Sequence, residues 1–171
     1  NTGSWVTDVN TQGGIFVCPE SLPLEYGVDR IPRTWIVKSL KDEYANYLTF
    51  SAEEDNSTFG VESHGENTPN LQYSLDGGKT WIDLKAETAI TLKSKGDQAL
   101  IRGTNPDGFS IAENQYTKFT MTGKIAASGS VMSLIDGSGE TIEIPNGFCF
   151  THLFEDCASL IQAPALPAKR L

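Results

Sequence analysis

The chain has 171 residues, of which 39% are hydrophobic, and a formal net charge of −9 at pH 7. Its 13 Lys and Arg residues are scattered, which argues against binding to nucleic acid through phosphates and against attraction to an anionic membrane. No apolar run approaches the roughly 20 residues of a membrane-spanning helix, so we expect no membrane insertion.

Residues 1–41 combine many apolar side chains with well-spaced Pro and Gly residues. Short strands are expected at residues 14–18 and 33–40. The segment is too apolar for a flexible linker and too short for a core of its own. We therefore predict that it anchors the protein by packing on the next domain or on other protein chains. The candidate anchoring side chains are Trp5, Ile15, Phe16, Leu24, Tyr26 and Trp35.

Residues 42–122 have the pattern of an all-β domain. Apolar and polar residues alternate in several segments, so that Leu48, Phe50 and Ala52 share one face. Turn residues separate the segments at short intervals, which is typical of a β-sandwich. The expected strands cover residues 47–52, 58–63, 71–75, 80–84, 89–93, 98–103 and 118–123.

Residues 123–171 are expected to form a hairpin cap followed by one unit of a repeat array. Strands are predicted at 125–127, 131–135 and 141–144, with a turn at 136–139, and a helix of about two turns at 148–155. The run from Cys157 onward ends in a Pro-punctuated Ala/Leu tail. A single repeat unit cannot bury its apolar side alone. Phe148, Phe150, Leu153 and Phe154 are therefore expected to pack only on the preceding hairpin.

The most specific local motif is Ser74-Leu-Asp-Gly-Gly-Lys-Thr-Trp81, an Asp-box pattern. It predicts a tight structural hairpin in which Asp76 accepts backbone N–H bonds, Gly78 takes a positive φ and Trp81 packs beneath the turn. Asp boxes occur in sialidases, but a sialidase needs several boxes and an arginine cluster. The chain has one box and few arginines, so the motif indicates a hairpin rather than an activity.

The catalytic inventory is small. His64 is interpreted as a loop histidine and His152 as a surface or stacking histidine, and the acidic run at 53–55 as a solvated turn rather than a Ca²⁺ site. No nucleophile elbow, phosphate loop, paired-Cys zinc site or HExxH motif is present. We therefore predict no catalytic, cofactor-binding or metal-binding residues and no cofactor. A glycosidase with two placed carboxylates is the weaker alternative.

The chain has three cysteines, Cys18, Cys149 and Cys157. Their odd number and irregular spacing argue against a disulfide scaffold. The favoured interpretation is that they are small buried hydrophobic residues. A disulfide between Cys149 and Cys157 is the alternative.

Five motifs occur in order along the chain: the segment 47–52, the Asp-box segment 71–81, Ile101-Arg-Gly-Thr104, the segment 119–134, and the Cys-Phe…Leu-Phe-Glu-Asp-Cys-Ala-Ser-Leu…Ala-Pro-Ala-Leu-Pro-Ala run near the C-terminus. Together they resemble the BspA-like surface proteins of gut Bacteroidales, over roughly residues 44–171. The resemblance implies an Ig-like β-sandwich followed by leucine-rich repeats, display on a surface, and binding to proteins, glycans or cells. It implies no catalytic residues.

The chain departs from that family at both ends. It holds barely one repeat unit, and residues 1–41 do not look like the start of a lipoprotein. Similar Ig-like and repeat modules occur on the fibres and capsid decorations of phages that infect gut Bacteroidales. There an ordered N-terminal segment anchors the protein to the particle, and distal modules meet the host.

We therefore expect a mainly β protein with an N-terminal anchoring segment (1–41), an Ig-like β-sandwich (42–122), and a hairpin cap with the first leucine-rich-repeat unit (123–171). The expected function is non-enzymatic attachment, as a virion fibre or capsid-decoration protein on the virion surface. Residues 1–41 would contact capsid or tail proteins, distal repeats would bind a host surface protein or glycan, and a homo-oligomer is expected. The alternative is an adhesin on the bacterial outer cell surface, and a carbohydrate-active enzyme is a weaker third class.

Overall fold

The computed structural model describes residues 14–18, 35–39 and 47–168, with side chains over 47–168. The chain divides into two compact units, Asn1–Tyr44 and Ala45–Leu171. In the first unit, β1 (Gly14–Cys18) pairs in parallel with β2 (Trp35–Ser39). Both strands lie where the sequence predicts them.

Three of the anchoring candidates lie in these two strands. Ile15 and Phe16 belong to β1, and Trp35 belongs to β2. Trp5, Leu24 and Tyr26 lie outside the described residues. Whether the six residues anchor the protein stays a prediction.

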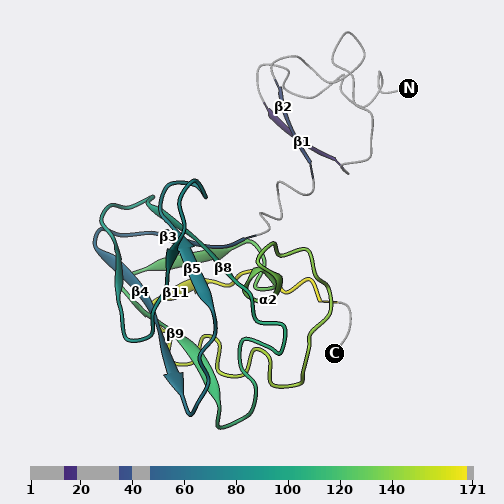
Figure 1. Ribbon diagram of the computed structural model, residues 1–171. Helices are drawn as coiled ribbons and strands as arrows, with labels where there is room; N and C mark the ends of the chain where they lie inside the picture. Colours follow the sequence, from purple (N-terminus) through teal and green to yellow (C-terminus); the bar gives the residue numbers. More distant parts are fainter. Residues whose placement is uncertain (1–13, 19–34, 40–46, 169–171) are drawn as a thin grey trace. The chain divides into compact units, whose positions relative to one another are not determined.

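The second unit contains two sheets (Figure 1). All neighbouring strands are antiparallel except β10 and β11, which are parallel. The larger sheet has the order β11 (Leu160–Gln162), β10 (Ile125–Ser128), β3 (Leu48–Ala52), β8 (Gln98–Gly103), β5 (Leu71–Ser74), β6 (Ile82–Asp83). The smaller sheet has the order β7 (Ile90–Leu92), β4 (Ser57–His64), β9 (Tyr116–Thr122).

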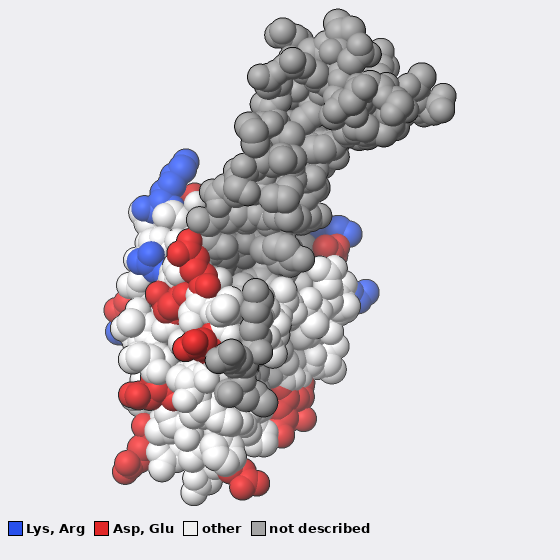
Figure 2. All heavy atoms as spheres, turned by 90° about the vertical axis from the view of Figure 1, so that its right-hand side faces the viewer, with Lys and Arg blue, Asp and Glu red and all other residues white. Residues whose placement is uncertain are grey.

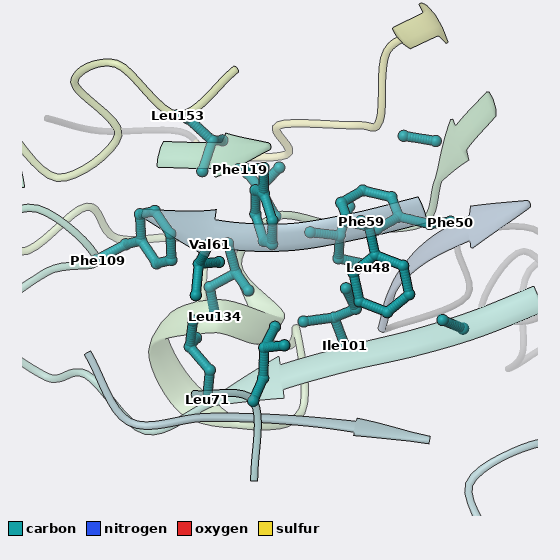
Figure 3. Packing of buried hydrophobic residues seen from close by; sticks show 14 of the residues in the cluster. Leu48, Phe50, Phe59, Val61, Leu71, Ile101, Phe109, Phe119, Leu134 and Leu153 are labelled. Carbon is teal, nitrogen blue, oxygen red and sulfur yellow. The ribbon is translucent and has the colours of Figure 1, made fainter. Parts of the chain in front are cut away.

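The core of the second unit is built from aromatic side chains of both sheets (Figure 3). Phe50 on β3 is fully buried and meets Phe59 on β4 edge-on, with ring centroids 5.4 Å apart. It meets Phe119 on β9 at 5.0 Å in the same geometry, a favourable arrangement for aromatic pairs. The protein is therefore mainly β, as predicted, and the two sheets are consistent with a β-sandwich.

Residues 131–135 were expected as a strand, and this prediction is wrong. They contain the one-turn helix α2 (Ser133–Asp136), which ends at Gly137 with φ 75°. The fully buried Ser133 hydroxyl accepts the Leu48 N–H and donates to the Ile101 carbonyl, both at 2.9 Å. Because it satisfies backbone groups of β3 and β8, the turn is fixed by tertiary contacts that a strand pattern cannot reveal.

The hairpin expected between strands at 131–135 and 141–144, with its turn at 136–139, does not form. The Asp136 carboxylate accepts the backbone N–H groups of Ser138, Gly139, Glu140 and Thr141. The loop therefore wraps around the Asp136 carboxylate. Desolvation by burial opposes the charged form of Asp136, but these backbone bonds outweigh it, and the pKa of the carboxyl is lowered.

The helix expected at residues 148–155 is also absent. The segment is a series of turns with i→i+3 hydrogen bonds, such as Thr151 N–H to the Phe148 carbonyl and Glu155 N–H to the His152 carbonyl. His152 and Asp156 have φ values of 62° and 60°. Because a left-handed residue cannot continue an α-helix, each of them interrupts the helical path.

The C-terminal segment packs on the core of the two sheets rather than on a preceding hairpin. Leu153 is only 8% exposed, and its carbonyl accepts the Phe119 N–H at 2.9 Å. The ring of Phe154 stacks on Phe119 with centroids 5.7 Å apart. Of the four residues expected to pack only on the preceding hairpin, Phe148 alone is largely exposed, at 45%. Residues 123–168 thus share one core with residues 47–122.

Candidate binding surface

The Asp-box segment forms the turn between β5 and β6 around the Asp76 carboxylate. This carboxylate accepts the N–H groups of Lys79 at 3.0 Å and Thr80 at 2.9 Å, and the hydroxyls of Thr80 at 2.6 Å and Ser74 at 2.8 Å. The Thr80 hydroxyl bond is the largest cause that holds the pKa of Asp76 far below its ordinary value. The carboxylate is thus fully used inside the turn.

Gly78 and Ser74 complete the turn. Gly78 has φ 88°, and its N–H donates to the Ser74 hydroxyl at 2.8 Å. Ser74 is 1% exposed, so one hydroxyl satisfies both a backbone donor and the Asp76 carboxylate. All these bonds lie within the turn, and they occupy the Ser74 hydroxyl and the Asp76 carboxylate.

Trp81 lies outside the core, half-buried and next to the outer face of the larger sheet. The Tyr47 ring is tilted against it with centroids 5.2 Å apart, and the Arg102 guanidinium carbon lies 4.0 Å from the centroid of the indole. A guanidinium over an indole is an attractive cation–π contact. Trp81 is therefore part of the surface, and its ring also lies close to the turn, because a Cβ added to Gly78 would be 3.7 Å from its Cζ2.

A chain of polar contacts continues from Arg102 across the sheet. Its Nε and Nη2 donate to the Gln72 side-chain oxygen at 3.0 and 2.8 Å, and the Gln72 amide nitrogen donates to Asp83 at 3.2 Å. We call the five residues Tyr47, Gln72, Trp81, Asp83 and Arg102 the Trp81 surface. Of these, only Trp81 was a predicted site residue. Arg102 follows the buried Ile101 on β8, so strand alternation indicates its outward direction, but the strand register was not predictable.

Both histidines contact the ring of Tyr116. The centroids of the His64 and His152 rings lie 4.5 and 4.1 Å from that of Tyr116. Glu62 lies 2.8 Å from His64 Nε2, and Glu155 lies 3.0 Å from His152 Nδ1. The stack joins β4 and β9 to the C-terminal turns. His64 is the last residue of β4 and pairs with Tyr116, so its prediction as a loop histidine is wrong. His152 makes the stacking contact that was predicted for it.

Lys118 lies near the same two acidic residues, Glu62 and Glu155. Its ammonium group lies 3.4 Å from Asp156 and 4.0 Å from both Glu62 and Glu155. Desolvation is the largest single influence and lowers the pKa of Lys118, but the hydrogen bond to Asp156 and the three acidic neighbours together raise it. Strand β9 is therefore tied to the C-terminal segment by charge as well as by packing.

Two clefts in the described residues share residues 68–70. The first, of about 330 Å³, has a floor of Val61, Leu71 and Leu84, and Asp83 and Lys85 also line it. The second, of about 310 Å³, is lined by polar residues of the loops around 66–70 and 104–108.

Within residues 47–168, no group of three or more His, Cys, Asp or Glu side chains is placed to hold a metal ion. Cys149 and Cys157 are free thiols, Cys149 buried and Cys157 half-buried. Burial raises the pKa of both thiols. Acidic side chains are spread over the face seen in Figure 2, and lysines and arginines do not gather into one patch there.

Comparison with known proteins gives no match: no family model, no curated protein and no solved structure matches this chain. In the described part of the chain, none of the helices has the length and hydrophobicity to cross a membrane.

Proposed function

We propose that the protein is a non-enzymatic attachment protein, a fibre or capsid-decoration protein of a phage particle. Residues 1–41 anchor it to capsid or tail proteins, and modules beyond an Ig-like β-sandwich bind the host surface. The C-terminal segment is the first unit of a leucine-rich-repeat array. This proposal follows the resemblance of the sequence motifs to BspA-like proteins and related phage modules.

One structural observation supports it most directly. Strand β11 adds in parallel to β10, with Leu160 beside Ile125, and stands at the edge of the larger sheet. Ile161 of β11 is 57% exposed, and Leu166, which follows the strand in sequence, is 55% exposed. Stacked repeats grow by parallel addition of like strands, each unit covering the apolar side of the one before. An edge of this kind suits the junction between a sandwich and an array.

The test is to locate the protein. Antibodies raised against residues 47–168 are used to probe density-gradient-purified phage particles and washed host cells from the same lysate. The proposal expects the protein to band with the particles at a fixed ratio to the major capsid protein. Protein found only in the outer-membrane fraction of uninfected cells would refute the phage assignment and favour the alternative, a cell-surface adhesin.

The non-enzymatic part is tested separately. Purified protein is incubated with a broad panel of glycans, and the products are separated by chromatography. We expect no hydrolysis. Cleavage of a glycan would overturn this part and support the carbohydrate-active alternative, provided that replacing one carboxylate of the chain abolishes the cleavage.

A further inference from the structure

We propose that the Trp81 surface is a binding site for a carboxylate-bearing saccharide, with the Arg102 guanidinium as the group that recognises the carboxylate. This site lies on the sheet itself and is additional to the distal modules of the proposed function. It does not depend on where the protein is located.

The free donors of Arg102 have the right arrangement for a carboxylate. A guanidinium carries five N–H donors. Two of its nitrogens, Nε and Nη2, already donate to Gln72, so the two N–H groups of Nη1 and one of Nη2 remain. These form the edge that binds a carboxylate with two parallel hydrogen bonds.

Arg102 is also held in place without an ion pair that would neutralise the charge of its guanidinium. Within residues 47–168, the ion pairs involve lysines and histidines, and Arg102 is in none of them. Its hydrogen-bond partner is the neutral amide of Gln72, whose orientation is fixed by the bond from its nitrogen to Asp83. The Trp81 ring fixes the guanidinium plane from the other side. The cation is therefore positioned in advance, in a protein of net charge −9, and complements an anion.

The surroundings favour a saccharide over a peptide. Tyr47 and Trp81 offer half-buried aromatic rings beside the guanidinium, which suit the C–H face of a sugar ring. Along the same outer face, strand register places the hydroxyl of Ser51 beside the amide of Gln98, and these groups hydrogen-bond at 3.0 Å. Ser128 follows on β10 and is exposed. Hydroxyl and amide groups on a flat face match a hydroxyl-rich ligand, whereas an extended peptide would use a sheet edge.

The test is NMR titration of the full chain, following the Arg102 Nε–H and Trp81 indole N–H signals. The probes are 3′-sialyllactose and tri-galacturonic acid, with lactose as the matched neutral sugar. We expect both acidic sugars to shift these signals at millimolar concentration, and lactose to bind at least about tenfold more weakly, the loss of one charge-assisted bidentate contact.

Two variants test the role of the guanidinium. Arg102→Gln removes the cation, and Gln72→Glu keeps the size of its side chain but supplies an internal carboxylate to Arg102. Each is expected to weaken the acidic sugars at least about tenfold. If Arg102→Gln unfolds, Gln72→Glu carries the test, because the contact with Arg102 is kept as an ion pair and only the bond from the amide nitrogen to Asp83 is lost. Lys124→Gln, at an exposed lysine whose ammonium lies 3.9 Å from Glu54, is the control and should bind like the parent.

Three results would overturn the proposal. They are equal binding of lactose and 3′-sialyllactose, unchanged binding of acidic sugars by Gln72→Glu, and no shift with either acidic sugar. Tighter binding of the peptide acetyl-Glu-Asp-Glu-amide than of both sugars would instead assign the site to an acidic peptide and refute the saccharide assignment. None of these results bears on whether the protein is found on phage particles.

Discussion

Replacement of Phe154 by alanine is expected to destabilise the second unit, although the residue lies in a segment that resembles part of a separate repeat. The Phe154 ring stacks on Phe119 at 5.7 Å and meets Phe50 edge-on at 6.4 Å. Truncation of a fully buried Phe costs about 3–5 kcal/mol, part of it from the cavity left behind. Phe154 is half-buried, but each aromatic contact adds about 0.5–1.5 kcal/mol. We therefore expect a loss of about 2–3 kcal/mol.

The assay is urea unfolding followed by circular dichroism, with the same slope for parent and variant. A loss of this size lowers the midpoint by roughly 1 M, given slopes of about 1–3 kcal/mol/M. Phe148→Ala is the matched control, since it makes the same chemical change six positions earlier at a ring that is 45% exposed. It should change stability by no more than about 0.5 kcal/mol.

Equal and small effects of the two substitutions would refute the reasoning. In that case the C-terminal turns would not share the core with the sheets. A separate, earlier unfolding of the C-terminal turns within the second unit would lead to the same conclusion, because a segment that shares the core must unfold with it.

Three further predictions concern stability. Asp76→Asn should make the stability of the protein less dependent on pH in the acid range. The pKa of Asp76 is lowered in the folded state, so the stabilisation by its carboxylate is complete above about pH 4 and is lost as the pH falls through the folded value. Urea midpoints of parent and variant between about pH 2 and pH 7 measure this difference. Ser133→Ala leaves a buried N–H of β3 and a carbonyl of β8 without their partner and should cost about 2–4 kcal/mol by urea unfolding, whereas an unchanged midpoint would contradict this role. Gly103→Ala would put a Cβ 2.6 Å from a backbone oxygen and should cost about 1–3 kcal/mol, while Gly147→Ala, with nothing within 4 Å, should be neutral in thermal melts.

The strands of residues 47–123 could be predicted because their signal is local. Alternation puts Leu48, Phe50 and Ala52 on one face, and turn residues mark where each strand stops. The structure confirms all seven expected strands with ends shifted by a few residues. The largest difference is β6, which is reduced to Ile82–Asp83.

The segments that were predicted wrongly depend on contacts distant in sequence. Residues 131–135 are apolar enough for a strand, but Ser133 satisfies backbone groups of β3 and β8, and this favours a helical turn. The apolar spacing of 148–155 suggests a helix, but the positive φ at His152 and Asp156 divides it into turns. Tertiary packing overrides local preference in both cases.

The Trp81 surface was only partly predictable for a related reason. Its motif identifies Trp81 and the turn, since eight consecutive residues define them. Gln72 and Arg102 come together because β5 and β8 pair with these two residues directly opposite each other. Sequence periodicity does not contain that register.

The order β11-β10-β3 at one end of the larger sheet has a mechanical consequence. Strand β3 is antiparallel to β10, and β10 is parallel to β11, so the chain enters β3 and leaves β11 at the same end of the sheet. The bridge between Ser130 and Ala165 lies on that side as well. Opposed tension on these two points would open the strands one hydrogen bond at a time, as in unzipping, rather than shear them together.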